Sequence, residues 1–318
     1  MNLQVEIESK VDEKEWNQKL TKSNASTTYQ ISHWGKVYEF YNSKPFFVTV
    51  RNSTGEIVGQ LLSIVHNEML WDGPTSLARF VGTKLNLRNS LTWLYGPIIY
   101  DEDHIDEIIS KILQALDQIS VKNKVVIIKG SSHPFLSKFS NQLFKQAGYQ
   151  IRSWATYITD LKQGEDFLYA GLDKKTRYDI RKSEENGLEF VVANDRSALD
   201  EFVELKVQEK LRGGKKTKAD SPHFYDSRWE HLHKNGYEKL FLTKYKGEPV
   251  AGILNVIFNG NVSQHGVSVS SARQPLGGPF LTWNTMKWCR EMKYLTYDMG
   301  GINPSPENDK EKSINFYK

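Results

Sequence analysis

The feature that most limits the folds open to this chain is a β-hairpin signature that occurs in both halves. Residues 47–65 read FVTVRNSTGEIVGQLLSIV, and residues 242–257 read LTKYKGEPVAGILNVI. Each stretch contains a β-rich run, a turn with a Gly-Glu pair, and a second β-rich run. The turns place Gly55 and Gly247 where a hairpin needs a left-handed backbone, which glycine adopts without a steric penalty.

The elements that follow each hairpin also come in the same order. Apolar residues recur at helical spacing in 105–119 and 280–292, and a β-rich run follows each, KVVIIKG and YLTYDMGG. A solenoid would repeat over a far shorter period, and 318 residues are more than one hydrophobic core normally holds. The chain is therefore predicted to be α/β (α+β) with two duplicated domains. Chance similarity of the two hairpins is the alternative.

The residues between the two repeats divide into further short elements. Helices are predicted at 141–149, 167–186 and 197–211, strands at 153–161 and 188–193, and a loop at 212–227. Gly187 is the residue expected just past the end of a helix. The domain boundary is placed near residue 150, which gives a first domain of 1–150 and a second of 151–311.

Composition and charge exclude several classes of protein. Hydrophobic residues make up 39% and charged residues 25% of the chain, as in soluble globular proteins, and a net charge of +4 does not require a nucleic-acid partner. The single cysteine, Cys289, excludes an internal disulfide. The N-terminus lacks the apolar core of a signal peptide, and no apolar run reaches the length of a membrane span. We expect a cytoplasmic protein without stable membrane insertion and without DNA as a partner.

Two clusters of cationic residues in the second half are candidate sites for anions, either phosphate, pyrophosphate or an RNA backbone. The first surrounds the Gly213-Gly214 pair, whose backbone amides can approach an anion closely. Its members are Arg212, Lys215, Lys216 and Lys218, preceded by Lys206 and Lys210 on a predicted helix. The second cluster, KKTRYDIRK, consists of Lys174, Lys175, Arg177, Arg181 and Lys182. Arg177 and Arg181 are four residues apart on one helix face. A solvated, mobile loop is the alternative for the first cluster.

The segment RQPLGGPFLTW, residues 273–283, is a candidate coenzyme A site. A Gly-Gly-Pro turn that enters a helix exposes free backbone amides, which can bind a pyrophosphate. Acyltransferases of the GNAT superfamily that use coenzyme A carry Gln/Arg-x-x-Gly-x-Gly/Ala at such a turn. This chain is similar in Gln274, Gly277 and Gly278 but has Pro279 at the last small position. A glycine-proline turn that merely starts a helix is the alternative.

His265 and Asp298 are the candidate residues for proton transfer. His265 lies in a predicted strand, VSQHGVSVS, and a neutral imidazole can deprotonate an attacking amine near neutral pH. A purely structural histidine is the alternative. Asp298 ends a predicted strand before a double glycine, where a carboxylate either faces a ligand crevice or caps the following turn. His231 and His233 are predicted to lie at the surface, because no nearby residues complete a metal site.

Nine segments, taken in order, resemble the FemABX family of non-ribosomal peptidyltransferases, the FemX-like aminoacyltransferases. The segments are TYQISHWGKV, GEIVGQLL, YGPII, AGYQIRSWATYITDL, LDKKTRYDIRKSEENGLEF, LRGGKKTKADSPHFY, GEPVAGILNVIFNGNVSQHGVS, PFLTWNTMKW and the final YDMGG…INFYK. Together they extend over nearly the whole chain. The resemblance implies two tandem GNAT-like domains, each a mixed, mostly antiparallel sheet flanked by helices, without the coiled-coil arm of some members.

The resemblance also implies an activity. Better known family members move an amino acid from aminoacyl-tRNA to the side-chain amine of a peptidoglycan precursor, and relatives occur in polysaccharide and other envelope pathways. We therefore expect an aminoacyltransferase without metal or organic cofactor, whose partners are aminoacyl-tRNA and a phosphate-bearing cell-envelope precursor. Coenzyme A is the donor only under the alternative of a GNAT N-acyltransferase. A non-catalytic RNA- or glycan-binding relative is the second alternative.

Residue roles carry over from the resemblance position by position. Lys36 is similar to a lysine that contacts the precursor phosphate, and the basic contact before HFY maps onto the cluster of Arg212, Lys215 and Lys216 without a unique choice. Arg181 is a further candidate phosphate contact. His265 takes the aromatic or histidine position before Gly-x-Ser. At the C-terminus, Tyr317 takes a phenylalanine position and Lys318 a lysine position thought to stabilise charge during acyl transfer. Residues 312–318 are predicted to pack back on the first domain.

Overall fold

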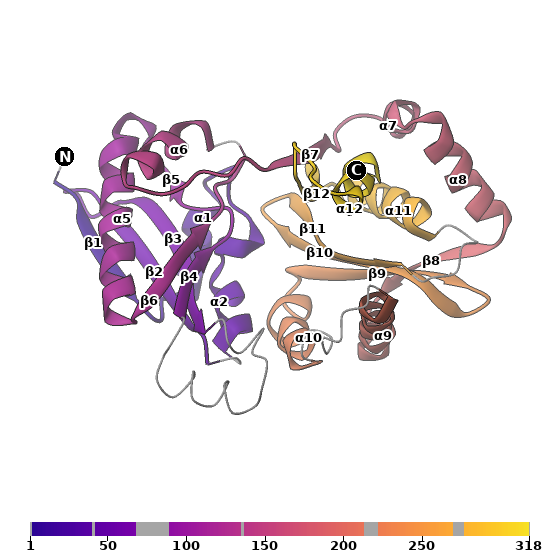
Figure 1. Ribbon diagram of the computed structural model, residues 1–318, viewed down its shortest axis with the longest axis horizontal. Helices are drawn as coiled ribbons and strands as arrows, with labels where there is room; N and C mark the ends of the chain where they lie inside the picture. The colour runs from indigo at the N-terminus through magenta and orange to yellow at the C-terminus, as the bar shows by residue number, and fades with distance from the viewer. Residues whose placement is uncertain are drawn as a thin grey trace. The chain divides into compact units, whose positions relative to one another are not determined.

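A computed structural model of the chain describes residues 2–39, 42–67, 89–134, 137–212, 222–269 and 277–317 (Figure 1). The chain divides into two compact units, residues 1–153 and 154–318. Each unit contains one six-stranded mixed sheet flanked by helices. The predicted α/β class with two tandem domains is therefore confirmed.

The first unit is a sheet with the strand order β1-β2-β3-β4-β6, to which the short β5 is added at β3. The described pairings are antiparallel except that of β4 with β6. The strands are β1 (Gln4–Glu8), β2 (Lys44–Arg51), β3 (Ile57–Asn67), β4 (Asn89–Trp93), β5 (Ile98–Ile99) and β6 (Val125–Gly130). The helices are α1 (Glu13–Leu20), α2 (Ser32–Glu39), α5 (Ile105–Lys122) and α6 (Ser137–Gln146).

The core of the first unit lies between this sheet and α5. Ile108, Ile112 and Leu116 follow one another at helical spacing along α5, and all three are fully buried. Helix α5 lies so close to the sheet that β3 has no room for a side chain at Gly59. A Cβ on Gly59 would lie 2.6 Å from the Ile108 side chain. The periodicity visible in the sequence is thus the apolar stripe that covers the sheet.

The second unit is a sheet with the strand order β7-β12-β11-β10-β9-β8, in which β11 and β12 are parallel. Its strands are β7 (Ala155–Asp160), β8 (Leu188–Ala193), β9 (Glu238–Tyr245), β10 (Glu248–Phe258), β11 (Asn261–Val269) and β12 (Thr296–Ile302). Its helices are α7 (Glu165–Gly171), α8 (Lys174–Glu185), α9 (Arg196–Arg212), α10 (Pro222–Arg228), α11 (Gly277–Glu291) and α12 (Asp309–Tyr317). Helix α11 packs on the sheet and against α8, whereas α9 and α10 lie on the opposite face (Figure 1).

The duplication predicted from the two hairpins is present in the structure. The series β2-β3-β4-α5-β6 of the first unit corresponds to β9-β10-β11-α11-β12 of the second. In both series the last strand lies parallel to the third. Gly55 and Gly247 each have a φ of +84° at the hairpin turn, as a left-handed turn position requires. One folding unit therefore occurs twice along the chain.

Two predicted elements differ from the structure. The helix expected over 167–186 is two helices, α7 and α8, because Leu172 is extended and Asp173 caps α8. The Asp173 carboxylate accepts hydrogen bonds from the backbone amides of Lys175 (2.8 Å) and Thr176 (3.0 Å). The loop expected over 212–227 becomes helical from Pro222, which is tolerated in the first turn of a helix. Residues 213–221 of that loop lie outside the described residues.

The prediction that His233 lies at the surface is wrong. Its ring is buried and stacks on Trp229, with 3.8 Å between the ring centroids. The two residues begin and end a π-helical turn, Trp229–His233, which directs the histidine inward. Burial, with a smaller contribution from the positive charge of Lys239, lowers the pKa of His233 to about 4.

This burial predicts a pH-dependent stability. Unfolding returns the pKa of His233 to about 6.5, so the unfolded chain binds the proton more readily and the unfolding free energy falls as the pH falls. We expect this residue alone to remove about 2 kcal/mol of unfolding free energy between about pH 7.5 and about pH 5. Urea denaturation at both pH values measures the effect. His233→Phe should abolish this part of the pH dependence, and an unchanged dependence in that variant would contradict the assignment.

The C-terminal helix α12 is joined to the second unit by polar contacts. The Asn315 side-chain amide donates to the Asn303 backbone carbonyl at 2.7 Å, and the Asn303 side-chain amide donates to the Glu311 carboxylate at 2.8 Å. These bonds connect α12 to the residue that follows β12. The expected packing of residues 312–318 on the first domain stays a prediction.

Candidate active site

The two parallel strands of the second unit are paired over only part of their length. β11 and β12 share a short ladder whose last pair joins Ser263 to Asp298. Beyond this pair, β11 continues along β10 to Val269, while β12 continues along β7 to Ile302. We call the end of the shared ladder the β11–β12 fork.

Each of the two strands carries a bulge at the fork. In β11 the pairing with β10 passes from Gln264 to Gly266, so that His265 is the extra residue. In β12 the pairing with β7 is interrupted between Asp298 and Gly301. Bulges re-aim side chains and often lie next to active sites. The two residues expected to transfer protons, His265 and Asp298, therefore both lie at the fork.

His265 and Asp298 share one face of the sheet. Tyr297 and Met299 pack into the apolar cluster beneath α11, so the side chain of Asp298 between them points to the opposite face. That opposite face carries α9 and α10. His265 is directed to the same face, because Arg228 of α10 is close enough to influence its charge.

The surroundings of His265 favour the neutral imidazole. Burial, and then the positive charges of Arg228 and Lys206, lowers the pKa of His265 well below its usual 6.5. Arg228 is held by Glu238, whose carboxylate accepts from Nε at 2.7 Å and also from Nη2, and both side chains are buried. Lys206 donates to the Val267 carbonyl of β11. An imidazole that stays neutral at physiological pH can accept a proton from an amine.

The Asp298 carboxylate is engaged by its neighbours. Oδ1 accepts from the Gly300 amide at 2.8 Å and is in hydrogen-bond contact with the Thr156 hydroxyl, which also lies 2.9 Å from the Gly300 carbonyl. The side chain thus caps the turn that follows it, as one of the two interpretations of the sequence predicts. A role for Asp298 in proton transfer stays a prediction.

The corresponding strands of the first unit show no fork within the described residues. β4 and β6 stay paired to their common end at Trp93 and Gly130. The Trp93 ring covers this end, since a Cβ on Gly130 would lie 1.9 Å from a ring atom. The indole N–H is itself held by the Gly96 carbonyl at 3.1 Å. Of the two duplicated sheets, the second is therefore the one in which the described strands separate.

Lys36, the residue similar to a phosphate-contacting lysine, lies in the first unit and lines a pocket of about 300 Å3. Its ammonium group is paired with the Glu13 carboxylate at 2.5 Å, and His33 lies 3.5 Å from the same carboxylate. The hydrogen bond from Lys36, followed by its charge and that of His33, lowers the pKa of Glu13. Lys36 is thus held at a pocket by an acidic neighbour, which an anionic ligand would have to replace.

The structure describes only some of the other predicted substrate contacts. Arg181 is exposed on α8. Arg212 ends α9 and Tyr317 ends α12, and the side chains of both are outside the description. Lys215, Lys216 and Lys318 lie outside the described residues.

The glycines of the candidate coenzyme A segment have a packing role. Gly277 and Gly278 are buried at the start of α11. A Cβ on Gly277 would lie 3.0 Å from the Ala251 side chain and 3.2 Å from that of Val250, so the absence of a side chain lets α11 approach β10. Pro279 contributes no amide hydrogen to the helix N-terminus. The packing of Gly277 agrees with the alternative interpretation, a turn that starts a helix, and a coenzyme A site at this turn stays a prediction.

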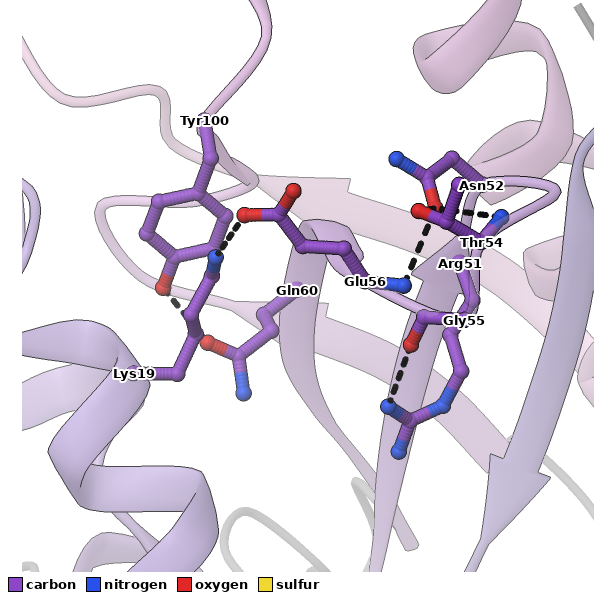
Figure 2. Close-up of polar contacts among 8 residues, drawn as sticks. All are labelled: Lys19, Arg51, Asn52, Thr54, Gly55, Glu56, Gln60 and Tyr100. Atoms are coloured by element: carbon purple, nitrogen blue, oxygen red, sulfur yellow. Dashed lines mark hydrogen bonds and ion pairs between the residues drawn. The ribbon is translucent and has the colours of Figure 1, made fainter.

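A second recess of the first unit, of about 620 Å3, is lined by charged groups that local contacts hold in place. Figure 2 shows Lys19 directed at Glu56, with Nζ 3.2 Å from Oε1 and 4.6 Å from the centre of the Tyr100 ring. The Tyr100 hydroxyl donates to Gln60 at 2.5 Å, and the Asn52 carboxamide accepts from the Glu56 amide at 2.9 Å (Figure 2). Because these groups satisfy one another, we assign no substrate to this recess.

Two parts of the fork were not indicated by the sequence. Arg228 follows an unremarkable Asp-Ser pair, and the residue that holds it, Glu238, comes from the start of another strand. Thr156 is a threonine in an ordinary β-rich run. No spacing or periodicity in the sequence marks either Arg228 or Thr156. Each acts through partners that become its neighbours only when the chain folds.

Comparison with known proteins agrees with this architecture. Residues 172–313 match the acetyltransferase (GNAT) domain family. The fold is similar to the crystal structure of FemX, with a TM-score of 0.74 and 16% identity over 100% of this chain and 93% of FemX. It is also similar to a tandem GNAT protein from the clavulanic acid biosynthesis pathway, with a TM-score of 0.57 and 11% identity over 99% of this chain and 95% of that one. L-PGS from Bacillus licheniformis has a TM-score of 0.52 and 18% identity over 95% of this chain and 81% of L-PGS. No curated protein sequence matches the chain.

These similarities define the fold of the protein. Residues 172–313, within the second unit, match a GNAT acetyltransferase domain, and the whole chain shares its fold with FemX and with a tandem GNAT protein. It is FemX-like in its architecture. Among the described helices, none is both long and apolar enough to cross a membrane.

Proposed function

We propose that the chain is an aminoacyltransferase that moves an amino acid from aminoacyl-tRNA to an amine of an anionic cell-envelope precursor, either of peptidoglycan type or of a polysaccharide. The observation that carries this proposal is the β11–β12 fork, where His265, kept neutral by its surroundings, lies at the end of a parallel strand pair. The resemblance of the sequence to FemABX proteins and the similarity in fold to FemX support the choice of aminoacyl-tRNA as the donor. The reaction would take place in the cytoplasm.

The chemistry requires a base, aligned reactants and a stabilised oxyanion. The unprotonated acceptor amine attacks the ester carbonyl of the donor, forming a C–N bond and a tetrahedral oxyanion, and His265 takes one proton from the attacking nitrogen. The ester C–O bond then breaks, and His265 returns this proton to the ribose oxygen of the departing tRNA. Alignment of the two reactants can supply about 7 kcal/mol or more of the barrier reduction, and Lys318 is proposed to stabilise the oxyanion.

Phosphate groups of the acceptor are proposed to bind basic residues. The pocket beside Lys36 has a volume of about 300 Å3, at the lower end of the range for small-molecule sites. An acceptor phosphate would exchange places with the Glu13 carboxylate at the Lys36 ammonium group. The cluster that contains Arg212, Lys215 and Lys216 is proposed to hold a second phosphate or the tRNA backbone.

Acyl transfer from coenzyme A is the second candidate. It is supported by the match of residues 172–313 to an acetyltransferase (GNAT) domain. The start of α11 is the expected pyrophosphate site, but Pro279 removes one of its amide donors.

The test is a transfer assay with labelled aminoacyl-tRNAs and, separately, labelled acyl-CoAs against a pool of UDP-linked precursors. The proposal expects product from aminoacyl-tRNA and none from acyl-CoA. Product from acyl-CoA alone, together with coenzyme A binding that Gly278→Trp abolishes, would establish the second candidate instead. If neither donor yields product with folded protein, the chain is not a transferase for these acceptors.

Removal of residues 313–318 is expected to damage activity more than stability. The deletion removes Lys318 and the hydrogen bond from Asn315 to Asn303, which contributes about 1 kcal/mol. Loss of an oxyanion-stabilising group is expected to lower the transfer rate about 100-fold. Transfer rate and melting temperature are measured for the deletion and for Lys318→Ala. Full activity after the deletion would show that the terminal lysine takes no part in the reaction.

A further inference from the structure

We propose that the exposed face of α8 binds a short single-stranded stretch of RNA, with one base stacked on Tyr178. We call this face the α8 stripe; its members are Lys174, Lys175, Tyr178, Arg181 and Lys182. The inference rests on the proposed function in one respect, namely that the RNA is the single-stranded 3′ end of a charged tRNA. The binding surface itself is argued from α8 alone.

The stripe places one aromatic ring at the centre of four cations. Lys174 and Lys175 precede Tyr178 by four and three residues, and Arg181 and Lys182 follow it by three and four. Residues at these spacings are neighbours on a helix surface. All five side chains are exposed, and Tyr178 has 56% of its surface accessible. The opposite side of α8 is the packed one, where Ile180 and Ser183 are buried.

Three of the four cations of the stripe are available to a ligand. Within the part of the chain that the structure describes, Lys174, Lys175 and Arg181 form no ion pair, and Lys182 lies 3.4 Å from Glu185. Arg177 is different, because its guanidinium donates to the Ala170 carbonyl at 2.8 Å and to that of Leu172. It joins α8 to α7, and the interpretation of Arg177 and Arg181 as two anion contacts stays a prediction.

The dimensions of the stripe fit a nucleic-acid strand. From Lys174 to Lys182 the helix rises about 12 Å, over which one stacked strand places three to four phosphates. Lysine and arginine contacts to phosphates give affinity without sequence preference. An exposed tyrosine among them adds a stacking platform for a base, which requires a strand whose bases are free.

A membrane surface suits the stripe less well than RNA does. A helix that binds a bilayer inserts a continuous apolar face between the lipid head groups. In α8 the one apolar residue besides Tyr178 is Ile180, and it is buried against the rest of the unit. The stripe therefore offers charge and a single ring, which match the phosphates and one base of a nucleic acid.

The place of α8 in the unit is compatible with delivery of a donor. Helix α8 packs against α11, on the face of the sheet opposite to α9 and α10 (Figure 1). His265 and Asp298 are directed to the α9–α10 face. A donor bound along α8 and an acceptor amine at His265 would thus approach the β11–β12 fork from opposite faces of the sheet.

The test is fluorescence anisotropy of the full chain with a labelled, unstructured and uncharged RNA of about 12 nucleotides. Tyr178→Ser is expected to weaken binding about 10-fold, while Tyr178→Phe, which keeps the ring, should bind like the wild type. The double variant Lys174→Gln with Arg181→Gln should reduce the slope of log K against log salt by about 1.4, or about 0.7 for each phosphate contact. Lys234→Gln, an exposed lysine that follows the π-helical turn, is the matched charge control and should change nothing.

The outcomes separate this proposal from the proposed function, because uncharged RNA needs no transfer reaction. RNA binding that depends on Tyr178 and Arg181 supports the α8 stripe even if no aminoacyl transfer is found. Wild-type protein that does not bind the RNA, or variants that bind it unchanged while circular dichroism shows them folded, overturn the proposal. Variants that lose binding to phosphatidylglycerol vesicles but bind the RNA unchanged would show that the stripe contacts a membrane. This result would overturn the proposal as well.

Discussion

His265→Asn is expected to lower the transfer rate by about 100-fold or more while the protein stays folded. The acceptor nitrogen must lose a proton as it forms the bond to the ester carbonyl carbon, and a well-placed base contributes about 100-fold to 10,000-fold. His265 is the imidazole at the fork, and its burial, together with the positive charges of Arg228 and Lys206, favours the neutral form. The rate is measured in the aminoacyl-tRNA assay, with circular dichroism and melting temperature as checks on the fold.

The pH dependence of kcat/KM tests whether His265 acts as the base. A base acts in its unprotonated form, so kcat/KM should fall as the pH falls through the pKa of His265 in the folded protein. Because that pKa is lowered, the acidic limb should lie below the ordinary histidine value of about 6.5. Lys206→Gln removes one of the charges and should move the limb to higher pH. His231→Asn, at a partly exposed histidine of the same unit, is the control and should leave both rate and limb unchanged.

A wild-type rate in His265→Asn would show that the amine loses its proton to another group, either Asp298 or the substrate itself. An acidic limb that persists in this variant would point to the same conclusion. A limb above the ordinary histidine value would contradict the assigned effect of Arg228 and Lys206 on the imidazole.

Arg228→Ala is expected to lower the free energy of unfolding by about 3 to 5 kcal/mol. The substitution leaves the buried Glu238 carboxylate without its partner, and an uncompensated buried charge is costly. This is a large fraction of the stability of an ordinary domain, which is about 5 to 15 kcal/mol. Urea denaturation followed by circular dichroism measures the change.

The double variant Arg228→Met with Glu238→Leu distinguishes the loss of unfolding free energy on removing one partner from the net contribution of the intact pair. Replacing both charges with apolar groups of similar size should restore most of the lost stability, because desolvation of the pair offsets much of its attraction. The exposed pair Arg196–Asp200, on α9, supplies the control, and Asp200→Ala, which leaves the second ion pair of Arg196 with Asp226 in place, should cost about 1 kcal/mol or less. Equal stability of Arg228→Ala and the wild type would mean that Glu238 takes up its proton or a new partner at little cost.

Local patterns in the sequence predicted most of the elements of the fold. Turn glycines such as Gly247 and the helical spacing around Ile112 depend on neighbouring residues, so the hairpins and α5 could be recognised without the structure. The break between α7 and α8 was missed although the sequence carries a signal for it, since Gly171 disfavours a helix interior and Asp173 is a favoured N-cap residue. The burial of His233 was missed because the π-helical turn that directs it inward has no composition signal.

The sequence by itself determined the duplicated α/β organisation and named His265 and Asp298 as candidates, because hairpin turns, apolar periodicity and residue chemistry are local properties. The tertiary structure alone decided that these two residues meet at one fork and that the strands of the second unit separate there, whereas those of the first do not. It also decided that His265 favours the neutral form, because that state depends on the burial of the ring in the folded chain and on α10 and α9 bringing Arg228 and Lys206 to β11. These are properties of register and long-range contact, which residue spacing along the chain does not encode.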